Sequence, residues 1–346
     1  MTRLIVIQPR EDEAGTMAAL VEDGVLQDFY VDAPDDKHEM EDIHLVRIKR
    51  IIPKQGAAHV KMANGAKGFL REAGAVKEGQ LVIAQVSGLA SPDKGTPLTA
   101  RRLHRGRYAI LTPDAPGVNV ARSIKDKDER ARLTDIATPL IGEDGAGVII
   151  RSAAIDADAD MLASDITALM EVERAVVEAA AALEISLLAA APDAMMRAWR
   201  DWPEPDEVIE ESDAFDRLGL WDQIDALRTP NVALHGGGWM AIEPTTALIA
   251  IDVNTGGDLT PQAAANANLR TCADLPRQLR LRGLGGQITI DFAPMRKNDR
   301  KAVESALKKA FANDGVQTTF AGWTPLGHFE MLRKRERRPL KELLGG

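Results

Sequence analysis

The 346-residue chain is 45% hydrophobic and carries 43 basic and 52 acidic side chains, for a net charge of −9. This length allows two or three compact units, and no apolar run reaches the roughly eighteen residues of a membrane span. A single cysteine, Cys272, excludes an internal disulfide and a Cys-x-x-Cys metal site. The apolar N-terminal stretch is too short for a signal peptide, so we expect a cytoplasmic protein.

The charges are unevenly distributed along the chain. Residues 1–42 hold 12 acidic and 3 basic side chains, whereas residues 276–338 hold 14 basic and 6 acidic ones. This asymmetry favours an anionic ligand bound locally by an otherwise acidic protein. Two solvated faces of opposite charge explain the same pattern equally well.

The first hundred residues predict strands. Residues 2–8 and 17–31 form strands with a turn at residues 22–24, and an acidic connector without regular structure spans residues 32–42. Five short strands separated by glycines then predict a small barrel of the OB type, a common platform for oligonucleotides. These strands are expected at residues 45–51, 57–62, 67–70, 80–86 and near Leu98. Phe69 can stack a base on such a barrel, although a core position is the commoner role of an aromatic residue.

The middle of the chain predicts a phosphate contact and a long helix. Strands at residues 106–112 and 147–151 flank a polar helix at residues 125–136. Arg151 and Ser152 end the second strand, where a guanidinium and a hydroxyl can hold a phosphate. From two residues alone, a surface salt bridge is the better explanation. Residues 157–190 have helical spacing throughout and predict one long helix.

Two strands that end in carboxylates dominate the last third. A proline-rich break at residues 203–207, a helical stretch at residues 213–228 and a hairpin with its turn at residues 236–238 precede them. Asp252 and Asn254 end an apolar strand on one face, and Asp291 ends another such strand. A helix at residues 260–283 joins the strands in a βαβ-like unit, which places both carboxylates at one edge. Oxygen ligands of this kind suit a hard divalent cation.

A helix at residues 297–311, a strand at residues 316–320 and a basic tail at residues 333–338 complete the chain.

Four motifs in this region resemble the catalytic core of the ribonuclease E/G family. They lie in the family's order and near its spacing, which makes the combination highly specific. They are residues 249–258, residues 266–269, residues 277–286 and residues 290–292, with residues 326–335 resembling the segment that closes the core.

The resemblance covers nearly the whole chain and implies an α+β multidomain fold. It implies a discontinuous RNase-H-like subdomain at residues 1–42 and 191–240, with an OB-type RNA-binding barrel inserted at residues 43–103. It further implies a 5′-end sensor region at residues 104–190 and an α/β, DNase-I-like catalytic subdomain with the basic tail at residues 241–346.

The same resemblance implies roles for individual residues. Asp252 and Asp291 would hold Mg²⁺, for which Mn²⁺ could substitute, and Asn254 would orient the catalytic site. Phe69, Lys94 and the altered aromatic position His59 would contact RNA. The pocket for a 5′-monophosphate would comprise Gly106, Ile110, Arg122, Arg151 and Ser152. Arg277, Arg280 and Arg282 are candidates for backbone contacts with RNA, and solvation at the helix surface or pairing with Asp274 is nearly as good an explanation of these arginines.

Three departures from the family pattern concern the loop after the first metal ligand, the second RNase-H-like piece and the zinc-binding segment. The loop at residues 254–258 is several residues shorter than in the family, and the second RNase-H-like piece at residues 191–240 is also shorter. The family's zinc-binding Cys-Pro-x-Cys segment is not found before Gly346. We therefore expect no zinc, and a monomer or a dimer that is not linked by zinc.

The predicted function is that of a Mg²⁺-dependent endoribonuclease that acts on single-stranded RNA in ribosomal RNA processing and messenger RNA decay. It would favour 5′-monophosphorylated ends and leave 5′-phosphate and 3′-hydroxyl products. An RNA-binding regulatory protein with weak or no cleavage is the alternative from a different class. A Mg²⁺-dependent phosphatase of small esters is disfavoured by the barrel and the basic tail.

Overall fold

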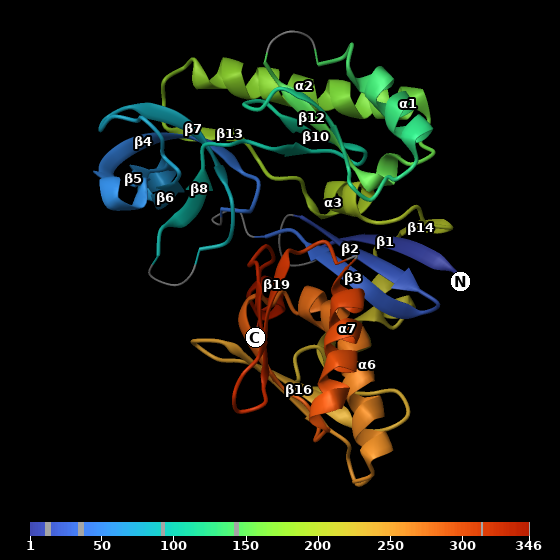
Figure 1. Cartoon of the computed structure of the whole chain (residues 1–346). Helices are drawn as coiled ribbons and strands as arrows, with labels where there is room; N and C mark the ends of the chain where they lie inside the picture. The colour runs from blue at the N-terminus through green and yellow to red at the C-terminus, as the bar shows by residue number, and fades with distance from the viewer. Residues whose placement is uncertain (11–14, 34–37, 91–93, 142–144, 313, 346) are drawn as a thin grey trace. The chain divides into compact units, whose positions relative to one another are not determined.

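The computed structural model describes the chain apart from residues 11–14, 34–37, 91–93, 142–144, 313 and 346 (Figure 1). Its residues form two compact units. One unit combines Met1–Pro34 with Glu204–Gly346, and the other is the continuous segment Asp35–Pro203. The second unit is therefore inserted into the sequence of the first.

Five strands of the inserted unit close into a barrel, as the sequence predicts. Their order is β4-β5-β6-β8-β7, and β7 pairs again with β4 to complete the closure. Alternating apolar side chains such as Val46, Val60 and Leu98 fill the interior. The strands are β4 (Ile43–Ile52), β5 (Ala57–Lys61), β6 (Lys67–Arg71), β7 (Leu81–Val86) and β8 (Thr96–Thr99), with short 3-10 turns η1 (Pro53–Gln55) and η2 (Ala63–Gly65) between them.

A second sheet of the inserted unit carries two helices. Leu162, Ile166 and Leu169 recur at helical spacing on α2 and are buried in one core with Leu133 of α1 and side chains of this sheet. Figure 1 shows α1 and α2 beside the strands β10 and β12. The sheet order is β11-β12-β10-β9, and β11 was not predicted from the sequence. The elements are β9 (His104–Arg105), β10 (Ala109–Thr112), β11 (Gly117–Val120), α1 (Lys127–Ala137), β12 (Gly147–Ile150), η3 (Ser152–Ala154) and α2 (Ala159–Ala180).

The prediction of one helix over residues 157–190 is wrong at its C-terminal end. Helix α2 stops at Ala180, and Leu183 adopts a left-handed backbone with φ of 56°. Strand β13 (Ser186–Ala189) follows and pairs antiparallel with the start of β4. Pairing with a strand far away in the sequence thus outweighs the local helical preference of this Ala- and Leu-rich stretch. Helix α3 (Ala194–Asp201) ends the unit.

The N-terminal strands belong to the other unit. Strands β1 (Arg3–Pro9), β2 (Thr16–Glu22) and β3 (Val25–Val31) form an antiparallel sheet, as predicted, and β14 (Glu207–Glu210) adds to β1 in parallel. Phe215 of α4 (Ala214–Arg217) and Leu220 and Ile224 of α5 (Leu220–Ala226) are buried against this sheet. Residues from both ends of the chain therefore share one core.

A six-stranded sheet and two helices complete this unit. The sheet order is β15-β16-β17-β18-β20-β19. The helices α6 and α7, which lie side by side in Figure 1, bury apolar side chains such as Leu275, Leu279 and Leu307 in one core with this sheet. The predicted hairpin around residues 236–238 and the predicted strand–helix–strand unit are both present. The elements are β15 (Asn231–Ala233), β16 (Trp239–Pro244), β17 (Ile249–Asn254), α6 (Pro261–Leu281), β18 (Gly286–Asp291), η4 (Lys297–Asp299), α7 (Arg300–Phe311), β19 (Thr318–Trp323), β20 (Phe329–Arg333) and α8 (Leu340–Leu343).

The structure confirms the predicted α+β class and the closed five-stranded barrel. The comparison of the other parts with RNase H and DNase I, and the four domain boundaries, stay predictions. Among the described residues, no helix is long and apolar enough to cross a membrane.

Candidate active site

Asp252 and Asp291 end two adjacent parallel strands. They are register partners in the pairing of β17 with β18, so both side chains project from the same face of the sheet. Both are exposed, whereas the preceding Ile251 and Ile290 are buried in the core. In each strand the buried isoleucine packs in the core, and the carboxylate that follows it stays accessible to solvent.

Two further side chains lie beside the carboxylates. The Asn254 amide donates a hydrogen bond of 2.7 Å to Oδ2 of Asp252. His328 Nε2 lies 3.8 Å from Oδ2 of Asp291, within ion-pair distance when the imidazole is protonated. No role is predicted for His328 from the sequence, although it lies within residues 326–335, which resemble the segment that closes the family's core. Its position follows from the pairing of Ile290 with Phe329, which only the structure shows.

A buried asparagine on α6 holds the chain immediately after Asp291. Asn268 is 0% exposed, and its side chain exchanges two hydrogen bonds with the main chain of Ala293, at 3.0 and 2.9 Å. Helix α6 itself begins at the predicted cap, where the Thr260 hydroxyl accepts from the Ala263 N–H. Asn268 therefore positions the segment that follows the second carboxylate, a role that the sequence did not reveal.

The turn at residues 236–238 packs closely against the end of β17. A Cβ at Gly238 would lie 2.5 Å from the Asn254 carbonyl oxygen, and the backbone φ of Gly238 is 80°. Glycine is thus required both for the hairpin turn and for this approach. The hairpin therefore supports the strand end that carries Asn254.

The oxygen donors at this edge fit a hard divalent cation. Two carboxylates and one amide oxygen, all at the sheet surface, are ligands that Mg²⁺ prefers, and an exposed site leaves room for its retained waters. The side chains available for such an ion are Asp252, Asp291 and Asn254.

The barrel presents aromatic and basic side chains on its outer face. His59 on β5 is the register partner of Phe69 on β6, and their rings are 5.6 Å apart, edge to face. Lys61 and Lys67 form another exposed register pair on the same two strands. Lys94 is exposed just before β8. The structure thus brings His59 and Phe69 together as a surface pair instead of placing Phe69 in the core.

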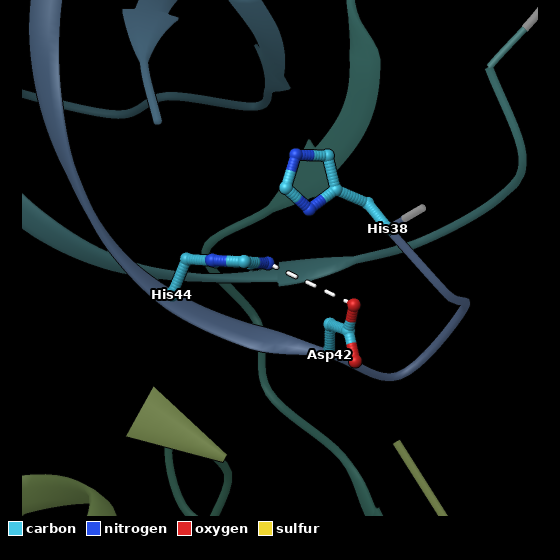
Figure 2. Close-up of side chains that lie close together, drawn as sticks. All are labelled: His38, Asp42 and His44. Carbon is cyan, nitrogen blue, oxygen red and sulfur yellow. Dashed lines mark ion pairs between the residues drawn. The ribbon is translucent and has the colours of Figure 1, made fainter. Parts of the chain in front are cut away.

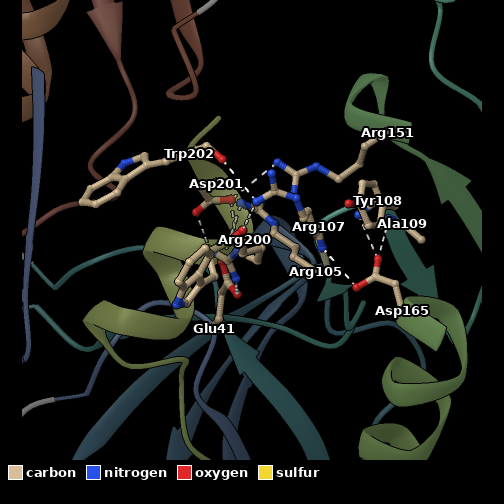
Figure 3. A network of polar contacts seen from close by, with 12 residues as sticks. Glu41, Arg105, Arg107, Tyr108, Ala109, Arg151, Asp165, Arg200, Asp201 and Trp202 are labelled. Carbon is tan, nitrogen blue, oxygen red and sulfur yellow. Dashed lines mark hydrogen bonds and ion pairs between the residues drawn. The ribbon is translucent and has the colours of Figure 1, made fainter. Parts of the chain in front are cut away.

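The residues predicted to form a phosphate pocket lie on or next to β9, β10, β11 and the end of β12. The Arg151 guanidinium donates to the Gly106 carbonyl oxygen and lies 3.4 Å from Oδ1 of Asp201 (Figure 3). Ser152 and Arg122 are exposed, and Ile110 is half-buried on β10. The salt bridge that the sequence favoured for Arg151 is therefore present, within the same set of residues that the resemblance assigned to a pocket.

Two acidic side chains, Asp165 and Asp201, contact polar groups near these residues. Asp165 accepts hydrogen bonds from the main-chain N–H groups of Arg107, Tyr108 and Ala109 (Figure 3). A Cβ on Gly106 would lie 2.4 Å from its carboxylate, which explains the glycine. Asp201 also pairs with Arg200, whose pKa is raised because Glu41 and Asp201 outweigh the opposing effect of burial.

Arg277 and Arg280 are engaged within their own unit. Arg277 Nε donates to Asp274 at 2.7 Å and Arg280 donates to Asp314 at 2.8 Å. Both line a cavity of about 690 Å³. Arg277 thus makes the pairing with Asp274 that the sequence left open, and it also donates to the Leu26 carbonyl oxygen at 2.8 Å. Arg282 is buried and donates to the Thr229 carbonyl oxygen, so this arginine does not lie at the helix surface.

A chain with an oligonucleotide-type barrel in one unit and paired surface carboxylates in the other has the parts of a nuclease. Comparison with known proteins defines the class further. The profile of the ribonuclease E/G family matches residues 104–209 and 204–336. The chain belongs to this family and is an endoribonuclease.

Its relatives include two kinds of ribonuclease. Ribonuclease G of Salmonella typhimurium is 28% identical over 401 positions, which cover 99% of this chain and 81% of the relative. Ribonuclease E of a Nostoc species is 30% identical over 390 positions, which cover 96% of this chain and 56% of the relative. Both alignments are longer than the chain of 346 residues, so the relatives hold residues that it lacks within the matched region.

Proposed function

We propose that this endoribonuclease hydrolyses phosphodiester bonds of single-stranded RNA with Mg²⁺ bound at Asp252 and Asp291. The register partnership of these two carboxylates carries the proposal, since it puts two oxygen donors on one exposed sheet edge. Mg²⁺ bound there would neutralise charge on the phosphorane-like transition state and activate water, so that the products carry 5′-phosphate and 3′-hydroxyl ends.

The neighbouring side chains have distinct tasks in this proposal. Asn254 holds the Asp252 carboxylate through its amide hydrogen, which leaves its own oxygen for orientation of the site. His328 stands beside Asp291 and fixes its direction when protonated. Asn268 keeps the segment after Asp291 in place, so the carboxylates meet the scissile phosphate with fixed geometry.

The inserted unit would present the RNA. Phe69 and His59 offer adjacent rings on which bases can stack, and Lys61, Lys67 and Lys94 supply positive charge for the backbone. Such a surface suits splayed single-stranded bases. Arg151, Ser152, Arg122, Gly106 and Ile110 would receive the 5′-monophosphate. This arrangement supports our proposal of an OB-type RNA-binding barrel at residues 43–103 and a sensor region at residues 104–190.

The same proposal assigns the remaining parts. Residues 1–42 and 191–240 would form the RNase-H-like subdomain, and residues 241–346 the DNase-I-like catalytic subdomain. Arg277 and Arg280 would approach RNA only by exchanging their present carboxylate partners for phosphate, so we assign the principal RNA contacts to the barrel.

The decisive experiment incubates purified protein with a 5′-monophosphorylated, A/U-rich single-stranded RNA in Mg²⁺ or in EDTA. We expect cleavage only with Mg²⁺, and we expect Asp252→Asn and Asp291→Asn to lower the rate by roughly 10²-fold or more without weakening RNA binding. Glu243→Gln is the matched control, because Glu243 is also an exposed carboxylate of this sheet.

Intact RNA in the presence of Mg²⁺, at protein concentrations that clearly bind it, would overturn the proposal. That result would favour the alternative function, an RNA-binding regulatory protein of the same family. Normal cleavage by both Asp variants would place the catalytic centre elsewhere in the chain.

A further inference from the structure

Three potential metal ligands meet where the chain enters the barrel. His38 and Asp42 precede β4, and His44 is its second residue. One ligand atom from each side chain lies within 4.8 Å of those of the other two. Figure 2 shows the three side chains pointing into one space, with the His38 and His44 rings edge to face at 5.0 Å between centroids.

His44 is buried, with 2% of its side chain exposed. Among the residues that the structure describes, no group meets hydrogen-bond geometry with either of its ring nitrogens. Its Nε2 lies 3.9 Å from Oδ2 of Asp42, beyond the reach of a hydrogen bond (Figure 2). Burial first, and His38 second, lower the pKa of His44 to about 4, and the Ser186 main chain only partly offsets this effect. The ring is therefore neutral near pH 7 and its lone pair is available.

A buried polar group without a partner is uncommon and calls for an explanation. A histidine is unusual at this position, because residue 44 shares a face of β4 with Val46 and Ile48. Both of these side chains point into the apolar interior of the barrel. An apolar side chain could fill this end of the barrel core without the free-energy cost of removing a polar group from water. A ligand that binds the imidazole nitrogen explains why histidine stands here.

The main chain holds Asp42 in place for such a ligand. Its Oδ1 accepts from the Ala191 N–H and its Oδ2 accepts from the Glu39 N–H, both at 2.8 Å. The neighbouring Glu41 adopts a left-handed backbone with φ of 85°, and its N–H donates to the Val86 carbonyl oxygen. Hydrogen bonds to a ligating carboxylate orient it toward a metal. The turn that carries His38 and Asp42 is thus fixed against the barrel strands.

We propose that His38, Asp42 and His44 bind a divalent transition metal of the zinc class. Two imidazoles and one carboxylate suit zinc, whereas Mg²⁺ prefers oxygen ligands throughout. Tetrahedral coordination with bonds of about 2.0–2.2 Å puts ligand atoms about 3.3–3.6 Å apart. The 3.9 Å gap between His44 Nε2 and Asp42 Oδ2 therefore closes by a few tenths of an ångström. The gaps to His38 are at most 4.8 Å and close by up to about 1.5 Å. The fourth position would hold water. The sequence-based expectation of no zinc concerned a cysteine segment and did not consider these residues.

The experiment measures binding of Co²⁺, an absorbing substitute for zinc, to the untagged full chain after removal of metals. Excess Mg²⁺ keeps the Asp252 and Asp291 edge occupied. We expect about one equivalent of Co²⁺ with the intense visible band of tetrahedral coordination, displaced by Zn²⁺ and not by further Mg²⁺. We also expect a Zn²⁺-dependent increase in Tm, since the metal binds the folded state.

His38→Ala is the main variant, because His38 is only partly buried and its loss leaves the barrel core unchanged. It should abolish the tetrahedral band and the Zn²⁺-dependent rise in Tm, and Asp42→Asn should do the same. His235→Ala, at an exposed histidine of the other unit, should change neither.

An identical Co²⁺ spectrum and Tm shift in wild type and His38→Ala would overturn the proposal, as would a wild-type protein without a tetrahedral band. Because neither readout involves RNA, the result is independent of the proposed cleavage reaction.

Discussion

The charges around Asp252 and Asp291 differ from those around Arg151. Asp252 and Asp291 are exposed beside each other, an arrangement that repels until a cation binds. Arg151, in contrast, already lies near the carboxylate of Asp201. The carboxylate edge therefore attracts a cation, whereas a phosphate at Arg151 must compete with an anion of the protein itself.

Competition between Asp201 and a 5′-phosphate for Arg151 predicts how a substitution changes the preference for 5′-monophosphorylated RNA. Asp201→Asn should increase the preference for 5′-monophosphorylated over 5′-hydroxylated RNA by about 1.4- to fivefold, because a partly exposed ion pair contributes about 0.2–1 kcal/mol. Arg151→Gln should reduce the preference to none. The measurement is the ratio of cleavage rates on the two RNAs for each protein, which cancels general losses of activity. A wild-type ratio of one would argue against the sensor pocket as a whole.

Sequence motifs indicated some of these residues and missed others. Asp252, Asn254 and Asp291 could be selected because each stands at the end of an apolar run. His328, Asn268 and Asp201 could not, since their partners lie 25 or more residues away in the sequence and only strand pairing or packing brings them close.

At the scale of elements, Glu173 of α2 links this helix to β9 and to Arg102, which precedes this strand, through hydrogen bonds. Glu173 accepts from His104 Nε2 at 2.6 Å and from Arg102 at 2.9 Å. Burial raises the pKa of Glu173, but the bonds from His104 and Arg102 outweigh it and the net pKa is lowered. The folded state therefore favours the ionised carboxylate.

The sign of this shift predicts an acid-dependent stability. Glu173 stabilises the fold fully above its unfolded pKa of about 4.5, and the contribution is lost as pH falls through the lower folded value. Glu173→Gln should thus lose roughly 1–3 kcal/mol of unfolding free energy at pH 7. Urea unfolding at several pH values should show wild type and variant converging in acid. A constant difference down to pH 3 would contradict this assignment.

Barrel closure depends on a glycine of β6. A Cβ at Gly68 would lie 2.6 Å from Leu98 Cδ1 and 2.8 Å from Val60 Cγ2, inside the core. Gly68→Ala should therefore destabilise the barrel by about 1–3 kcal/mol through overpacking. Gly315→Ala is the control, because no atom of the described residues lies within 4 Å of a Cβ there. Equal Tm values for the two variants would show that the barrel adapts without cost.

At the scale of the whole molecule, one unit is continuous and the other is built from both ends of the sequence. The barrel and the helix-covered sheet have their cores entirely within Asp35–Pro203. Phe215, Leu220 and Ile224 instead need strands β1–β3 to cover them. Residues 204–346 therefore lack part of their own core when they are separated from residues 1–34.

Fragments test this division. Residues 35–203 should unfold cooperatively when expressed alone, whereas residues 204–346 should not, because the buried face of α4 and α5 would be exposed to water. Joining residues 1–34 to residues 204–346 through a flexible linker should restore cooperative unfolding. The measurement is circular dichroism during thermal denaturation. Cooperative unfolding of residues 204–346 alone would show that β1–β3 are dispensable for this unit.

The sequence by itself determined the strands of the barrel, the carboxylate-ended strands and the helix between them, because their periodicity and their glycine boundaries are local signals. Tertiary structure alone decided that Ser186–Ala189 forms a strand and that β14 joins β1, since in each case the partner is distant in the sequence. It also decided which side chains stand beside Asp291 and Arg151. Local patterns report the conformation of a segment, whereas hydrogen-bond partners and neighbouring charges depend on which segments meet.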